Sequence, residues 1–154
     1  MSEVEKVDLI ALLDDIQKEV GDLLSIENEN LGAEALRQPK IFNRLQKLYS
    51  IHVRQLDRMQ MRKDVLTNRL KRYYGNKASD AEYKERPLTV VPLKGEIDEF
   101  IKVDEKYLEF MLDLKVQEQI VKYLEDAKRA LSDRGYMIKD AIEFRKLTQG
   151  TTTT

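Results

Sequence analysis

The first stretch of the chain alternates apolar and polar residues with the spacing of an amphipathic helix. From about Val4 to Leu24, apolar side chains recur every three or four positions. Ser25 to Gly32 is a polar break. Pro39 then stands where a helix can begin, because its fixed φ and missing N–H do no harm in a first turn. We therefore expect one helix before the break and a second one that begins near Pro39.

The second helix is predicted to run from about Pro39 to Tyr74, since no Gly or Pro interrupts it and Gly75 and Asn76 form a stop signal. Most residues at the two core positions of a heptad frame are apolar or aromatic, as in a coiled coil. These positions hold Phe42, Tyr49, Leu56, Lys63 and Leu70, and Leu45, His52, Met59, Leu66 and Tyr73.

Residues 75–95 interrupt the helical pattern. Pro87 and Pro92 flank a short apolar run, which favours an extended arm or a short edge strand. A third helix is predicted from about Glu96 to Asp133, on a second heptad frame that ends before Gly135. Its apolar frame positions are Phe100, Val103, Tyr107, Phe110, Leu114, Val121, Leu124 and Leu131.

These elements predict an all-α fold, with long amphipathic helices in a coiled-coil-like bundle that carries an extended arm. Residues 1–150 form a single domain in this prediction, and the four threonines 151–154 form a disordered tail. The apolar stripes are wide for so few helices, so we expect a homo-oligomer that buries the remaining apolar surface. The amphipathic segment after Gly135 is the candidate interface, through Tyr136, Met137, Ile138, Ile142 and Phe144.

The net charge of −1 hides a strongly uneven distribution. Residues 1–34 carry two basic and ten acidic side chains, whereas residues 35–77 carry twelve basic and two acidic ones. On a helical wheel, eight of the basic residues of the second helix lie within an arc of about 80°, opposite the apolar face. This basic stripe comprises Lys40, Arg44, Lys47, Arg54, Arg58, Arg62, Arg69 and Arg72.

A row of arginines suits a phosphate backbone, because each guanidinium donates two parallel hydrogen bonds to phosphate oxygens. The candidate nucleic-acid site comprises Arg58, Arg62, Arg69, Lys71, Arg72, Tyr73, Tyr74 and Lys77. Tyr73 and Tyr74 could serve as stacking platforms for bases or as packing residues at the helix end, and Tyr73 occupies a core heptad position. The stripe could also be a solvated face, or could pair with the acidic first helix or with a neighbouring subunit.

Catalytic and metal-binding patterns are absent from the sequence. The chain has no cysteine, and its one histidine, His52, falls on the apolar face, where a packed histidine is expected. Glu82 and Lys84 have the E-x-K spacing of some nucleases, which is a weak signal without strands to carry it. We expect no enzyme activity, no cofactor and no metal. No signal peptide or membrane-spanning run stands out, so a cytoplasmic protein is expected.

Three segments resemble the UvsY family, the recombination mediators of T-even-type bacteriophages. They are Leu66–Leu70 leading into Tyr73–Gly75, Tyr83 with the arm and then Lys102–Asp104, and Ala130–Lys139 with Arg145 and Gly150 beyond. The last segment, with its Arg-Gly-aromatic-x-Ile-Lys element, is the most specific. The resemblance covers roughly residues 12–150, and the N-terminal third matches in pattern only.

The resemblance implies a non-enzymatic mediator that binds single-stranded DNA as a homo-oligomeric ring, a hexamer or heptamer, in the host cytoplasm. Its implied partners are a UvsX-type recombinase and the phage single-strand binding protein. The family's Lys-x-Arg pair before the two tyrosines is matched here by Arg69, whereas Thr67 occupies the Lys position. The alternative is a coiled-coil scaffold or adaptor whose basic stripe binds an acidic protein partner.

Overall fold

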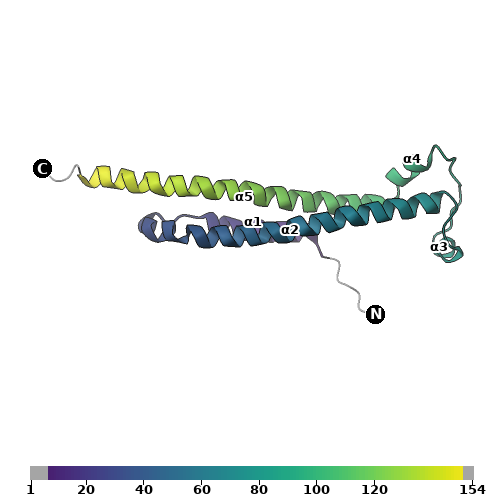
Figure 1. Cartoon of the computed structure of the whole chain (residues 1–154), viewed down its shortest axis with the longest axis horizontal. Helices are drawn as coiled ribbons and strands as arrows, with labels where there is room; N and C mark the ends of the chain where they lie inside the picture. Colours follow the sequence, from purple (N-terminus) through teal and green to yellow (C-terminus); the bar gives the residue numbers. More distant parts are fainter. Residues whose placement is uncertain (1–6, 151–154) are drawn as a thin grey trace. The chain divides into compact units, whose positions relative to one another are not determined.

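The computed structural model describes residues 7–150 of the chain. Its elements are α1 (Leu9–Leu24), the 3-10 helix η1 (Asn28–Asn30), α2 (Leu31–Tyr74), α3 (Asp80–Glu85), α4 (Ile97–Lys102) and α5 (Glu105–Gly150) (Figure 1). No strand forms among the described residues, and the all-α class is confirmed. The predicted disorder of residues 151–154 falls outside the described part.

The described chain divides into two compact units. The first unit contains the residues up to Val53 together with those from Glu118 onward, and the second contains Arg54–Gln117. The two long helices, α2 and α5, each supply residues to both units. A single domain over residues 1–150 stays a prediction.

In the first unit, α1 packs with the N-terminal part of α2 and the C-terminal part of α5. Helix α1 begins where the side chain of Asp8 accepts hydrogen bonds from the backbone N–H groups of Ile10, at 3.0 Å, and Ala11, at 3.2 Å. Residues 1–6, which include the predicted start near Val4, lie outside the described residues. The buried apolar side chains of this unit are Ile16, Val20, Leu31, Ile41, Leu45, Leu48, Ile120, Val121, Leu124, Ala127, Leu131 and Ile138.

Helix α2 begins earlier than the sequence predicted, at Leu31, so that Pro39 lies inside the helix instead of in its first turn. An internal proline removes one backbone hydrogen bond and costs about 3 kcal/mol. The segment before Pro39 nevertheless stays helical because it is anchored in the core. Leu31 and Glu34 are each 4% exposed, and Glu34 also forms an ion pair with Arg37 at 2.9 Å.

Helix α5 continues through Gly135, so the predicted break at this glycine is wrong. A single glycine in a helix costs only about 1 kcal/mol relative to alanine. Gly135 lies where the side chain of Gln38 approaches α5 and donates a hydrogen bond to the carbonyl oxygen of Leu131 at 2.5 Å. A Cβ at Gly135 would lie 3.2 Å from Nε2 of Gln38, so the glycine makes room for a tertiary contact and does not end the helix.

In the second unit, α2 ends at Tyr74 as the sequence predicted. Asn76 takes a left-handed conformation with φ of 58°, and its N–H donates to the carbonyl oxygen of Tyr73 at 3.2 Å. The N–H of Lys77 donates to the carbonyl oxygen of Arg72 at 2.8 Å, which completes a Schellman cap. The left-handed residue is therefore Asn76, not Gly75.

The segment between α2 and α4 is only partly extended. It contains the short helix α3, which begins after Ser79, whose side chain accepts a hydrogen bond from the N–H of Glu82 at 3.3 Å. Neither an edge strand nor any other strand forms here, and residues 86–96 are irregular. Because Glu82 and Lys84 lie on this helix, no strands present them as a nuclease site. We call residues 75–96 the arm.

The predicted third helix is interrupted before it becomes α5. Helix α4 ends at Lys102, and α5 begins at Glu105. The carboxylate of Asp104 accepts hydrogen bonds from the backbone N–H groups of Lys106, at 2.9 Å, and Tyr107, at 3.2 Å, as an N-cap residue does. Val103 is consequently 71% exposed and is not the core residue that the heptad frame predicted.

Candidate nucleic-acid interface

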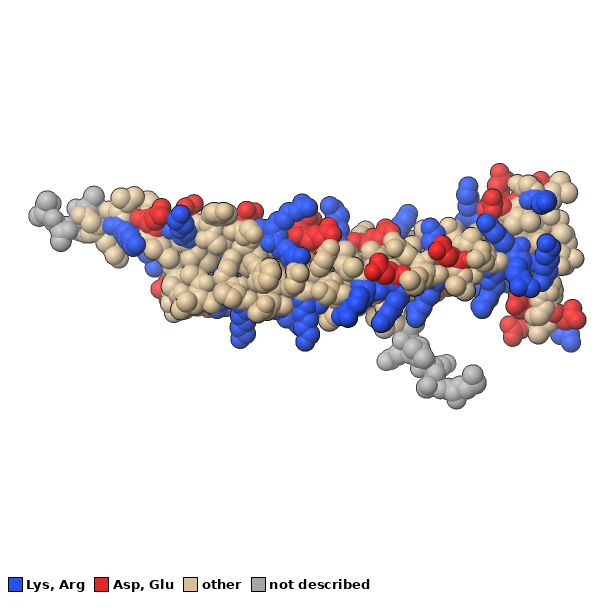
Figure 2. Space-filling view, viewed as in Figure 1, with Lys and Arg blue, Asp and Glu red and all other residues tan. Residues whose placement is uncertain are grey.

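Four arginines of α2 in the second unit form an exposed row. Arg58, Arg62, Arg69 and Arg72 are all exposed. Within residues 7–150, none of the four has a carboxylate at ion-pair distance. Figure 2 shows lysine and arginine side chains gathered over the C-terminal end of α2. This row offers unneutralised guanidinium groups to an anionic partner.

Part of the basic stripe in the first unit is used internally. The guanidinium group of Arg44 donates to the carboxylate of Glu19 on α1 at 2.5 Å, and this hydrogen bond raises the pKa of Arg44. The pairing with the acidic first helix that the sequence left open therefore occurs at Arg44. Arg44 lies outside the candidate nucleic-acid site, all of whose residues belong to the second unit.

Tyr73 and Tyr74 are core residues, each 6% exposed. Their ring centroids lie 5.0 Å apart with the planes nearly perpendicular, and the ring of Tyr83 stacks on Tyr73 at 5.3 Å. The guanidinium carbon of Arg86 lies 5.0 Å from the centroid of the Tyr73 ring. Neither ring has a free face for a base, so the structure places both tyrosines in the helix-end packing role that the sequence also allowed.

Asp104 joins this aromatic cluster to α5. Its Oδ2 accepts hydrogen bonds from the hydroxyl of Tyr74 and from the guanidinium group of Arg86, both at 2.6 Å. The Asp104 side chain is fully buried, whereas that of Arg86 is 35% exposed. Burial alone would raise the pKa of Asp104, but the hydrogen bonds from Tyr74, Arg86 and the backbone of Tyr107 outweigh it and hold the pKa below its usual value.

The hydroxyl of Tyr74 stays protonated in this arrangement. Burial, followed by the hydrogen bond to Asp104, raises the pKa of Tyr74 to about 12. The hydroxyl of Tyr73 donates to the carbonyl oxygen of Arg86 at 2.9 Å, and that of Tyr83 donates to the carbonyl oxygen of Tyr73 at 2.7 Å. These bonds fix the arm on the end of α2 and so fix the surroundings of Arg69 and Arg72.

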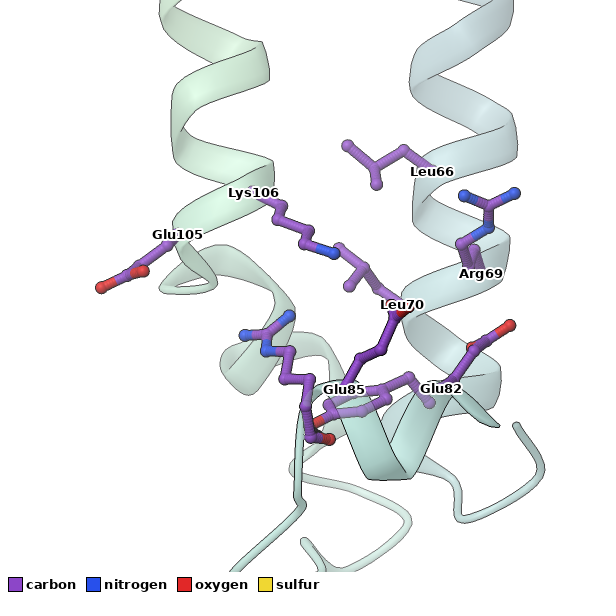
Figure 3. Close-up of a pocket in the computed structure, with 9 residues that line it drawn as sticks. Leu66, Arg69, Leu70, Glu82, Glu85, Glu105 and Lys106 are labelled. Carbon is purple, nitrogen blue, oxygen red and sulfur yellow. Dashed lines mark hydrogen bonds between the residues drawn. The ribbon is translucent and has the colours of Figure 1, made fainter. Parts of the chain in front are cut away.

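A pocket of about 640 Å³ opens beside this cluster (Figure 3). Arg69 reaches it from α2, and Lys106 extends from α5 toward Leu70. Three cations and three carboxylates line the pocket, namely Arg69, Arg86, Lys106, Glu82, Glu85 and Glu105. With the charges balanced, this pocket has no preference for an anion.

The remaining predicted site residues occupy different surroundings. Lys71 and Lys77 are exposed at the end of α2. Of the candidate interface residues on α5, Tyr136, Met137 and Phe144 are between 61% and 68% exposed. Ile142 is half-buried. Ile138 is only 2% exposed, because its side chain packs in the core of the first unit and not on the surface.

His52 is buried, as the sequence predicted, and burial lowers its pKa. Residues 7–150 contain no group of three or more His, Cys, Asp or Glu side chains placed to hold a metal ion. Over the same residues, no helix combines the length and the apolar character needed to cross a membrane.

Arg86 and Lys94 were not predicted as site residues from the sequence, and Asp104 appeared there only at the end of the Lys102–Asp104 segment. Arg86 and Asp104 hold the arm in place, and Lys94 lies beside the cations at the end of α2. The signal for Asp104 was present, because an Asp directly before an amphipathic run, with Glu105 in the first turn, is a common N-cap pattern. No signal in the sequence predicts that Lys94 lies at the end of α2.

The fold and surface define an all-α protein with an exposed row of arginines. The family model described as "Recombination, repair and ssDNA binding protein UvsY" matches residues 21–151, and the chain belongs to the UvsY family. None of the curated protein sequences matches the chain.

Solved structures similar to this chain include crystal structures of the bacteriophage T4 recombination mediator protein UvsY. Lattice type II has a TM-score of 0.76 and 19% identity, and covers 89% of this chain and 97% of the other. Lattice type I has the same TM-score and identity, and the match covers 87% of this chain and 98% of the other. Lattice type IV has a TM-score of 0.72 and 19% identity, with 88% and 98% covered. At this identity the likeness establishes the fold.

Proposed function

We propose that this chain is a non-enzymatic recombination mediator. It binds single-stranded DNA through the arginine row of α2 and promotes loading of a UvsX-type recombinase onto strand that is covered by the phage single-strand binding protein. The observation that carries the proposal is the row of exposed, unneutralised arginines in the part of the chain that the family model matches.

The binding chemistry is electrostatic and independent of base sequence. Arg62, Arg69, Arg72 and a nearby lysine each donate to phosphate oxygens, and bound cations leave the strand as the contacts form. Four phosphate contacts per subunit give a slope of log K against log salt near −2.8, at about −0.7 per contact for single strands. The contacts need neither ATP nor a metal.

Self-association multiplies this weak site. In a closed ring, a hexamer or heptamer, one strand contacts several subunits, and the effective concentration of the second site raises the overall affinity. The exposed apolar side chains Met137 and Phe144 on α5 support such an assembly. Multivalent wrapping bends the strand and loosens the competing binding protein.

The test of DNA binding removes two arginines seven residues apart on α2. Arg62→Ala with Arg69→Ala should lower affinity for an oligonucleotide about tenfold or more at 0.1 M salt and reduce the salt slope by about 1.4. The matched control is Lys115→Ala with Lys122→Ala, which removes two exposed cations with the same spacing from α5. Unchanged affinity and slope in the arginine variant would assign the row to protein contacts and favour the scaffold.

Loading requires a separate assay. ATP hydrolysis by a UvsX-type recombinase on strand coated with the phage single-strand binding protein should begin sooner when this protein is added. The arginine variant should lose this effect, and the lysine variant should keep it. If the wild-type protein does not shorten the delay before ATP hydrolysis begins, the loading role is wrong, whereas the DNA-binding proposal is unaffected.

A further inference from the structure

A second pocket, of about 470 Å³, lies where the arm meets the end of α2. Its charged lining consists of Lys71 and Arg72 from the last turn of α2, Lys77 from the start of the arm and Lys94 from the far part of the arm. No carboxylate lines it, in contrast to the balanced pocket beside Arg69. Four cations around one hollow favour an anionic ligand.

These four cations are available to a ligand. Within residues 7–150, none of them has a carboxylate at ion-pair distance. All four side chains are exposed. The nearby carboxylate of Glu96 accepts a hydrogen bond from the backbone N–H of Leu93 at 3.2 Å, so it stabilises the turn that carries Lys94.

The helix dipole accounts for only part of this charge. Cations in the last turn of a helix are stabilising, which explains Lys71 and Arg72 at the end of α2. It does not explain Lys94, which comes from a different segment. The carbonyl oxygens of Arg72 and Tyr73 are already hydrogen-bonded in the Schellman cap, so the cap does not require a lysine from the arm.

The arm holds Lys94 in a defined place. Before Lys94 in the chain, Arg86 forms an ion pair with Asp104. Around Lys94 itself, the N–H of Glu96 donates a hydrogen bond to the carbonyl oxygen of Leu93 at 2.8 Å and closes a turn. A ligand therefore meets a backbone that is already ordered, which reduces the entropy cost of binding.

The pocket also has an apolar wall. Among its lining residues, Tyr74 and Pro92 are buried, Ile97 is half-buried, and Val91 is 57% exposed. Cations beside an apolar surface fit a nucleotide unit, whose phosphate is charged and whose sugar and base are not. A free inorganic phosphate would leave this wall uncovered.

Arg72 connects this pocket to the arginine row, because it also lines a small hollow that contains Arg69. We propose that the pocket binds a backbone phosphate of single-stranded DNA, with Lys94 as a DNA-binding residue supplied by the arm. This assignment rests on the proposed function and extends the strand's path from α2 onto the arm.

The test compares two lysines of the arm. Lys94→Ala should reduce the salt slope of oligonucleotide binding by about 0.7 and lower affinity about fivefold at 0.1 M salt. Lys84→Ala, the matched control, removes an exposed lysine of α3 that lies outside the pocket and should behave as the wild type. Both variants should keep the wild-type Tm, since neither side chain is buried.

A second readout uses lysine acetylation followed by mass spectrometry. A bound oligonucleotide should protect Lys71, Lys77 and Lys94 together and leave Lys84 reactive. Protection by pyrophosphate but not by the oligonucleotide would overturn the proposal in favour of a site for free phosphates.

The two proposals fail in different ways. A wild-type protein without salt-dependent DNA binding would overturn both. If the wild type binds and the α2 arginine variant is weakened, while Lys94→Ala matches Lys84→Ala, only the pocket assignment is wrong.

Discussion

Asp104 is a residue of the second unit on which four polar contacts converge. Its carboxylate caps α5 and also accepts hydrogen bonds from Tyr74 and Arg86, so it joins three segments of the chain. A buried carboxylate is tolerated only with such partners, because an unpaired one costs several kcal/mol. Its role is to hold the arm beside the cations at the end of α2.

We expect Asp104→Ala to lower the free energy of unfolding by roughly 3 kcal/mol, from the lost cap and the lost charged hydrogen bonds. The pKa of Asp104 is lower in the folded protein than in the unfolded chain. Its contribution is therefore complete above about pH 4 and is lost as the pH falls through the folded-state pKa. Urea unfolding between pH 7 and pH 3 measures this.

Asp104→Asn provides the control for pH, because the amide does not titrate. The wild type should lose more stability than this variant as the pH falls below about 4. Parallel pH profiles for the two proteins would show that other carboxylates dominate acid unfolding.

At the scale of elements, Arg134 holds α1, α2 and α5 together in the first unit. Its side chain is 2% exposed and forms an ion pair with Glu34. It also donates to the carbonyl oxygens of Leu24, at 3.2 Å, and Ser25, at 3.1 Å, where α1 ends, and to Gln38 on α2 at 2.7 Å. One planar guanidinium group thus donates to acceptors at the C-terminal end of α1 and on α2.

We expect Arg134→Ala to lower the free energy of unfolding by about 3 kcal/mol, because the buried Glu34 carboxylate loses its buried partner and keeps only Arg37, whose side chain is 40% exposed. Arg134→Lys should recover only part of this loss, since an ammonium group cannot replace the fork of donors. Arg129→Ala is the control on the same helix. Its exposed pair with Asp126, at 3.7 Å, should contribute less than about 1 kcal/mol. Equal losses for Arg134 and Arg129 in urea unfolding would contradict this role.

At the scale of the whole molecule, the exposed apolar residues of α5 bear on assembly. Met137 and Phe144 are seven positions apart and are 61% and 67% exposed, so they share a face that a neighbouring subunit could cover. Ile138 lies between them in the sequence but faces the core. An interface test that includes Ile138 would therefore confuse unfolding with dissociation.

We expect Met137→Asp with Phe144→Asp to give smaller species of unchanged helical content, because a charge on a covered apolar surface opposes association. Ile138→Asp should instead lower the Tm strongly, as a charge placed in the core does. Sedimentation velocity and circular dichroism together separate the two outcomes. A native mass for the double variant would place the subunit contact elsewhere.

The sequence by itself determined the helical class, the end of α2, the burial of His52 and the row of cations on one helix face. Each of these features follows from local periodicity or from a local stop signal. Such signals depend only on residues that are close in the sequence. The same reasoning failed where a tertiary contact changed the outcome. Helix α2 extends past Pro39 because Leu31 and Glu34 are buried, and α5 passes Gly135 because Gln38 needs the space.

The candidate site divides in the same way. Arg62, Arg69 and Arg72 were predictable because one helix places them on one face. Only the tertiary structure decided that Tyr73 and Tyr74 are enclosed by Tyr83 and Arg86, and that Lys94 joins the cations at the end of α2. Those contacts join residues of α2 to the arm, and helix periodicity carries no information about how an irregular segment folds back.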